Sequence, residues 1–205
     1  MKAYKNISSI LFIVILTVIV LNADSMSFSN LGSNNSSGMF SKIDLKNTAI
    51  NEKKDVTIER NRIAEVAYKE IGNVGGEKFW SWYGFNGYVP WCCCFVSWCA
   101  DQCGYIDAGI IPKFAAVTAG ENWFMNNDQW IWPNEEPSPG MIIFFDFTDT
   151  NMENNKDGIP DHVGIVRYVL DDYVYCIEGN YHDTCKDTKY SLNHRNIFGY
   201  GVPKY

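Results

Sequence analysis

The stretch Trp91-Cys92-Cys93-Cys94-Phe95-Val96-Ser97-Trp98-Cys99-Ala100 decides the fold of this chain. It predicts a helix that runs from about Cys92 to Cys103 and stops at Gly104. At about 100° per residue, Cys92, Cys99 and Cys103 fall nearly on one line of that helix, which must face the body of the protein. The helix therefore opens with the thiol of Cys92, at the end where partial positive charge favours a thiolate.

Around this helix, the sequence predicts other helices first and an antiparallel sheet afterwards. Apolar residues spaced by four, at Ile63, Ala67 and Ile71, indicate a helix that begins near Asp55 or Thr57. An aromatic, glycine-rich loop follows from Gly72 to Trp91, and a further helix is expected around residues 115–125. Apolar runs then predict strands at residues 141–145, 163–170, 173–178 and 197–202, the middle two forming a hairpin. This order is typical of an α+β fold.

The N-terminus has the layout of an export signal. Two lysines precede the apolar run of residues 10–21, and Ala23 follows as a small residue. We expect residues 1–23 to be a signal peptide or, if residues 7–21 insert as a membrane tether, an N-terminal anchor. Residues 24–57 are rich in Ser and Asn and are interpreted as a flexible linker, and residues 58–205 as the folded domain. In either case we expect the domain to work outside the cytoplasm, secreted or at the cell surface.

Composition excludes some classes of protein. The net charge of −7 provides no basic surface for phosphates, so we expect no nucleic-acid partner. Seven cysteines are an odd number for an exported chain, which leaves at least one thiol unpaired. Cys176 and Cys185 flank a predicted bend, and the sequence leaves open whether they form a disulfide.

The three consecutive cysteines do not predict a metal site. Successive helical side chains diverge by about 100°, so Cys92, Cys93 and Cys94 cannot all meet one ion. Cys93 and Cys94 are interpreted as packing residues. The oxygen-rich loop of residues 146–161 does not fit the spacing of a calcium loop, and we interpret it as solvated. We expect no metal and no cofactor.

Four residues in sequence order predict a thiol hydrolase. Cys92 is the candidate nucleophile and His162, at the start of a strand, is the candidate base. Glu178 ends the neighbouring hairpin strand, so antiparallel pairing can bring it beside His162 to orient the imidazole. Asn180 follows one glycine later and is a candidate to orient the imidazole or to stabilise an oxyanion. A Cys–His pair of this kind predicts a pH profile with an acidic limb.

Aromatic residues before the nucleophile are candidates for substrate binding. The candidates are Trp80, Trp82, Tyr83 and Trp91, although such residues also supply much of the core of a small domain. We expect Trp91 and Trp98 to be largely packed, and the other three to lie nearer the cleft.

The same blocks resemble a known family. Four blocks are similar to the cysteine, histidine-dependent amidohydrolases/peptidases, the CHAP family, within the papain-like NlpC/P60 group. In chain order they are Trp91-Cys92 with Phe95-Val96-Ser97-Trp98-Cys99, residues 139–145, Asp161-His162-Val163-Gly164, and Glu178-Gly179-Asn180. The resemblance covers roughly residues 58–205. It implies a papain-like α+β fold with Cys92 as nucleophile, His162 as base, Glu178 as orienting acid and Asn180 as their partner. Three consecutive cysteines depart from the family pattern, which usually has one.

The resemblance also implies a substrate and leaves alternatives. The family cleaves peptidoglycan, at the N-acetylmuramoyl-L-alanine amide or within the peptides, so we expect a peptidoglycan hydrolase that acts as a monomer. A non-catalytic cell-wall-binding module is one alternative. An NlpC/P60-type γ-D-glutamyl endopeptidase is the other, although the Glu-Gly-Asn ending favours the CHAP family.

Overall fold

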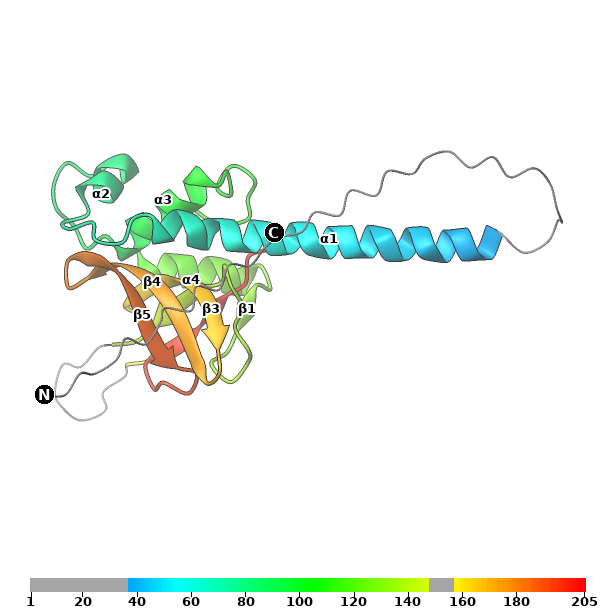
Figure 1. Cartoon of the computed structure of the whole chain (residues 1–205). Helices are drawn as coiled ribbons and strands as arrows, with labels where there is room; N and C mark the ends of the chain where they lie inside the picture. The colour runs from blue at the N-terminus through cyan, green and yellow to red at the C-terminus, as the bar shows by residue number, and fades with distance from the viewer. Residues whose placement is uncertain (1–36, 148–156) are drawn as a thin grey trace, which may run out of the picture. The chain divides into compact units, whose positions relative to one another are not determined.

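The computed structural model describes residues 37–147 and 157–205 (Figure 1). Internal contacts divide the chain after Ser41, and the unit Lys42–Tyr205 contains the whole sheet. The predicted export signal or anchor, including residues 7–21, lies outside the described residues, as do residues 24–36 of the predicted linker. No helix in the described part is long and apolar enough to cross a membrane.

Four helices precede a six-stranded sheet in the described chain. The helices are α1 (Ser37–Tyr68), α2 (Glu77–Tyr83), α3 (Cys92–Gln102) and α4 (Val117–Asn126). The strands are β1 (Trp130–Ile131), β2 (Ile142–Phe145), β3 (His162–Leu170), β4 (Tyr173–Tyr181), β5 (Thr184–Ser191) and β6 (Ile197–Gly201). All strand pairs are antiparallel, in the order β1-β6-β2-β3-β4-β5. The predicted α+β fold is confirmed.

The first helix begins earlier than the sequence predicted. Helix α1 starts at Ser37 rather than near Asp55 or Thr57, so helix covers part of the range interpreted as a linker. The reason is local, because residues 42–57 contain no proline or glycine and several good helix formers. Among the side chains of α1 whose burial the structure describes, the buried ones lie in its last turns, at Ile63, Ala64 and Ala67.

The sheet has an apolar layer on each face. Along β2, Ile142 and Phe144 pack into the cluster that contains the helices, and Ile143 and Phe145 pack into a second cluster on the other face. This alternation follows from the two-residue period of a strand. Helix α3 packs against β3 and β4, and α4 against β6 (Figure 1). The N-terminal end of α3 is thereby fixed against the two strands that carry His162 and Glu178.

The seven cysteines are all free and buried. The pairing of β4 with β5 sets Cys176 opposite Thr188, three residues from Cys185, and no disulfide joins the two cysteines. The hairpin is held by its strand pairing rather than by a covalent link.

Candidate active site

The candidate nucleophile lies at the first position of helix α3. Trp91 is the N-terminal cap residue and forms no side-chain capping bond. The N–H groups of the first turn have no partner within a helix, and the helix dipole places partial positive charge there. Cys92 is 5% exposed, so its thiol lies in a largely dry environment beside these groups.

His162 and Glu178 are in direct contact. The Nε2 of His162 lies 2.8 Å from the Oε2 of Glu178. Glu178 falls opposite Gly164 in the β3–β4 pairing, and its side chain runs diagonally to the imidazole two residues away on the same face. Because Nε2 is engaged by Glu178, the Nδ1 of His162 is the nitrogen that remains for Cys92. The sequence predicted this juxtaposition of His162 and Glu178 from the hairpin.

Glu178 is completely buried and has partners that the sequence did not indicate. Its Oε1 accepts a hydrogen bond from the hydroxyl of Thr188 on β5. Burial first, then the charge of Glu178 and a hydrogen bond to it, raise the pKa of Tyr190 on the same strand. A buried carboxylate is costly unless it is paired and hydrogen-bonded. These contacts, with His162, supply that pairing. They depend on the β4–β5 register, which the sequence does not reveal.

The electrostatics of the cluster favour a thiolate–imidazolium pair. The pKa of the Cys92 thiol is held well below its ordinary value by a hydrogen bond with Cys93 and by the hydrogen bond and charge of His162, which outweigh the opposite effect of burial. Burial would lower the pKa of His162, but its hydrogen bonds to Cys92 and Glu178 raise that pKa to about 10. Cys92 thus loses its proton at a pH where His162 retains one.

Asn180 lies near the end of β4, at the irregularity in the β4–β5 register between Glu178 and Tyr181. Its φ is +61°, and His182 and Asp183, the two residues between the strands, also have positive φ. Two such residues are typical of the type I′ hairpin turn, whose twist matches the strands. The side-chain Oδ1 of Asn180 accepts a hydrogen bond of 3.5 Å from the hydroxyl of Tyr88, so Asn180 is held at the rim beside His162.

An open pocket of about 330 Å³ lies at this rim. It is lined by Phe147, His162, Asn180, Tyr181 and His182. The ring of Phe147 lies 5.8 Å from that of His162. Two predicted catalytic residues therefore face the same hollow, along with three residues that the sequence did not indicate.

Trp91 is not available to a substrate, which corrects its prediction as a binding residue. Its side chain is 0% exposed, stacks on Phe79 and donates from Nε1 to the Oδ1 of Asp183 over 3.1 Å. The indole links the start of α3 to the β4–β5 turn. Its role in the structure is to fix the helix that carries Cys92 against the strands that carry His162 and Glu178.

The other three predicted aromatic residues lie on or near α2, not in a loop. The Nε1 of half-buried Trp80 donates a hydrogen bond to the carbonyl oxygen of Gly75. Trp82 and Tyr83 are partly exposed, and the ammonium of Lys113 lies 4.5 Å and 4.8 Å from their ring centres. None of the three lines the pocket at His162, so their contact with substrate stays a prediction.

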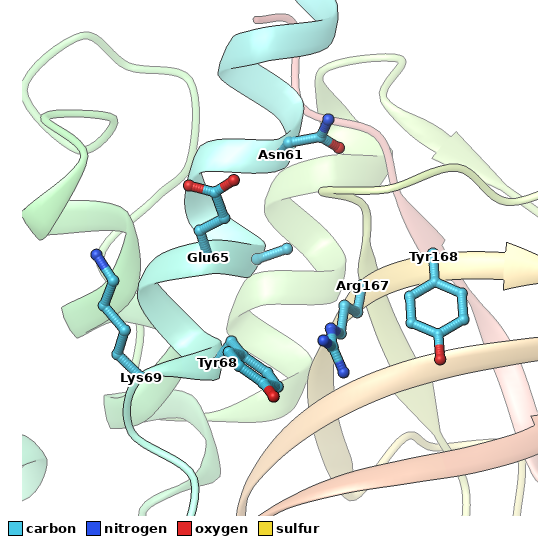
Figure 2. Close-up of a pocket in the computed structure, with 7 residues that line it drawn as sticks. Asn61, Glu65, Tyr68, Lys69, Arg167 and Tyr168 are labelled. Atoms are coloured by element: carbon cyan, nitrogen blue, oxygen red, sulfur yellow. The ribbon is translucent and has the colours of Figure 1, made fainter. Parts of the chain in front are cut away.

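A second pocket lies elsewhere, between α1 and β3 (Figure 2). In this pocket of about 350 Å³, the guanidinium of Arg167 sits 3.9 Å from the ring centre of Tyr68 and pairs with Asp187. None of its lining residues belongs to the predicted catalytic set. Within the described residues, no three His, Cys, Asp or Glu side chains are grouped to hold a metal ion.

Comparison with known proteins gives one family and a distant structural likeness. Residues 82–180 match the family model described as CHAP domain, a range that includes Cys92, His162, Glu178 and Asn180. A search of curated proteins found no match. Two solved structures are similar at 19% identity, "The crystal structure of Ly7917" with a TM-score of 0.44 and "The crystal structure of Ly7917 with the hydrolyzing product of MDP" with 0.45. Each alignment covers 70% of this chain and 62% of the other, so the chain spans less than two thirds of the protein it resembles.

Proposed function

Because residues 82–180 form a CHAP domain of the papain-like amidohydrolase/peptidase group, we propose that this protein is a peptidoglycan hydrolase with Cys92 as its nucleophile. The observation that carries the proposal is the chain of contacts from Cys92 through His162 to the buried Glu178. A nucleophile, a base and a group that orients the base are the parts that thiol acyl transfer requires.

The first half of the reaction forms a thioester. The thiolate of Cys92 attacks the carbonyl carbon of the scissile amide, and the carbonyl electrons move onto oxygen. The N–H groups of the first turn of α3 donate to this oxyanion. As the tetrahedral intermediate collapses, the C–N bond breaks and the imidazolium of His162 gives its proton to the leaving amine.

The second half releases the acyl group. His162, now neutral, takes a proton from a water molecule that attacks the thioester carbonyl. Collapse of this second intermediate breaks the C–S bond, releases a carboxylic acid and returns Cys92 to the thiolate paired with the imidazolium. Glu178 holds the imidazole in one tautomer and stabilises its positive charge in both halves.

The substrate and the location complete the proposal. CHAP domains act on peptidoglycan amides, either the N-acetylmuramoyl-L-alanine bond or a bond within the peptides, and the same class is proposed here. The apolar residues 10–21 after two lysines support export, so the domain would work outside the cytoplasm as a monomer, free or held by residues 7–21.

The proposal is tested on purified cell walls with the domain and its Cys92→Ala variant. We expect the wild-type domain to lower the turbidity of the suspension and the variant to be inactive while it stays folded. Mass spectrometry of the soluble fragments then identifies the bond, because a new N-terminal L-alanine reports an amidase and a new amine inside the peptide reports an endopeptidase. Equal lysis by the two proteins would exclude Cys92 as the nucleophile.

The same experiment separates the two alternatives. A non-catalytic cell-wall-binding module would sediment with the walls and release no fragments. A γ-D-glutamyl endopeptidase of the NlpC/P60 type would release fragments cut after the D-glutamyl residue. His162 interacts with both Cys92 and Glu178 and lines one pocket with Asn180, which favours an active enzyme over the binding module.

A further inference from the structure

The thiol of Cys93 lies against the candidate nucleophile. The Sγ atoms of Cys92 and Cys93 are 4.0 Å apart, within the range of a hydrogen bond between sulfur atoms. Consecutive helical side chains normally diverge, so this approach is a specific feature of the first turn of α3. It corrects the interpretation of Cys93 as a packing residue that points away from the site.

The direction of this hydrogen bond follows from the surroundings of the two thiols. Cys92 also faces His162, whose positive charge stabilises negative charge on its sulfur. For Cys93, the bond to Cys92 and the burial of a side chain that is 2% exposed both favour the protonated form. The proton between the two sulfur atoms therefore belongs to Cys93, which donates, and the charge belongs to Cys92, which accepts.

From this geometry we propose that Cys93 is a positioning residue, whose S–H donates to the Sγ of Cys92 and holds the nucleophile as a thiolate that faces His162. The donor restricts the thiolate to one orientation and stabilises its charge where little water is available. A thiol is a weak donor, but a hydrogen bond to a charged acceptor is stronger than one between neutral groups. The proposal rests on Cys92 being the nucleophile of the proposed function.

The neighbouring Cys94 provides a matched control. It is buried on the same helical turn, and burial first, then the charge of Cys92, raises its pKa to about 11. No hydrogen bond joins its thiol to Cys92 in the described structure. Removing the sulfur of Cys94 thus changes the packing beside the nucleophile without removing a donor to it.

The test is the pH dependence of alkylation of Cys92 by iodoacetamide, read by fragmentation of the peptide that carries the three cysteines. The wild type is compared with Cys93→Ala, Cys93→Ser and Cys94→Ala. We expect Cys93→Ala to move the midpoint upward by about one pH unit, so that alkylation below the midpoint slows by about tenfold. Cys93→Ser, which keeps a donor, should recover part of the shift, and Cys94→Ala should match the wild type.

Alkylation needs no substrate, so the outcome is independent of whether the protein cleaves peptidoglycan. A midpoint in Cys93→Ala equal to that of Cys94→Ala would overturn the proposal, even if Cys92 proves essential for lysis. If the alanine variant does not fold, Cys93→Val replaces it, since valine fills the space without a donor. A valine variant with the wild-type midpoint overturns the proposal equally.

Discussion

Glu178 reaches His162 across the α-carbon of Gly164. A Cβ at position 164 would lie 2.8 Å from the Cγ of Glu178 and 3.1 Å from the carbonyl oxygen of Ile177. The contact between the imidazole and the carboxylate thus depends on the absence of a side chain between them. This glycine is required by the close approach of a neighbouring side chain, not by an unusual backbone angle.

Gly164→Ala should therefore disable the site. The added methyl group must displace Glu178 or spread β3 from β4, and a misplacement of about 1 Å costs on the order of 10²-fold in rate. We expect kcat/KM for cell-wall fragments to fall by that order while circular dichroism still reports a folded protein. Gly87→Ala is the matched control, because a Cβ there meets nothing within 4 Å. Full activity in Gly164→Ala would show that the His162–Glu178 contact is unimportant.

The pH profile of kcat/KM should have two limbs. Activity falls as pH drops through the lowered pKa of Cys92, because the thiolate is protonated. Activity falls again as pH rises through about 10, where His162 loses the proton that it gives to the leaving amine. The profile should therefore be broad, with a plateau through neutrality.

Glu178→Gln should move the alkaline limb. The hydrogen bond and charge of Glu178 contribute to the raised pKa of His162, so removing the charge lowers that pKa and brings the limb to lower pH. The acidic limb reflects the pKa of Cys92, which is lowered first by the hydrogen bond with Cys93. This limb should therefore move less. An alkaline limb at the wild-type pH in Glu178→Gln would contradict the assignment of that limb to His162.

The sequence predicted the elements that carry strong local signals. Helix α3 combines a continuous apolar run with a glycine just beyond its end, and the β3–β4 hairpin has two apolar strands around Asp171–Asp172. From these two elements alone, His162 and Glu178 could be expected to meet. Their pairing follows from antiparallel register, which a short hairpin turn fixes.

Elements without an apolar pattern were missed. Strand β5 (Thr184–Ser191) contains Cys185 as its one fully buried residue, so its sequence reads as a polar loop. Its turn residues, His182 and Asp183, are not the Asn-Gly or Asp-Gly pair that usually announces a type I′ hairpin. Missing β5 also concealed Thr188 and Tyr190, which complete the surroundings of Glu178.

The sequence also could not predict that the side chains of the consecutive residues Cys92 and Cys93 lie close together. Average helix geometry separates Cys92 from Cys93, yet their two sulfur atoms lie 4.0 Å apart in the first turn of α3. Trp91 was both a binding candidate and a residue expected to be largely packed, and the structure shows it packed. An aromatic residue beside a nucleophile can lie either in a cleft or in the core, and the sequence alone does not determine which. Tertiary packing places Trp91 in the core.

The hydroxyl of Thr188 should support both stability and activity. Thr188→Val keeps the shape of the side chain but removes the donor to the buried carboxylate of Glu178. Leaving such a group with one partner fewer costs about 1–3 kcal/mol, so we expect the free energy of unfolding to fall by that amount and kcat/KM to fall with it. Urea denaturation and turnover measure the two effects. Thr57→Val, at an exposed helical position, is the control and should change neither by more than about 0.5 kcal/mol.

Substitutions at Trp91 and Trp82 should distinguish a tryptophan that stabilises the fold from one that binds substrate. Trp91→Phe removes the bond to Asp183 and part of the core, so it should lower the unfolding free energy by about 1–3 kcal/mol with KM nearly unchanged. Trp82 is partly exposed, and Trp82→Ala should raise KM with little loss of stability if its ring contacts the substrate. Unchanged KM in Trp82→Ala would remove this tryptophan from the binding surface.

Substitutions at Asn180 can distinguish a role of its side-chain amide in catalysis from a role in the local backbone geometry. With φ at +61°, alanine at this position is strained by about 1–2 kcal/mol whereas glycine is not. Asn180→Gly therefore removes only the amide side chain, and Asn180→Ala removes the amide and strains the backbone near the end of β4. If the amide assists catalysis, both variants should lose kcat at unchanged KM. If the residue serves only to accommodate the positive φ near the end of β4, Asn180→Gly should keep wild-type kcat and Asn180→Ala alone should be less stable in urea. Wild-type kcat in both variants would exclude a catalytic role for the amide of Asn180.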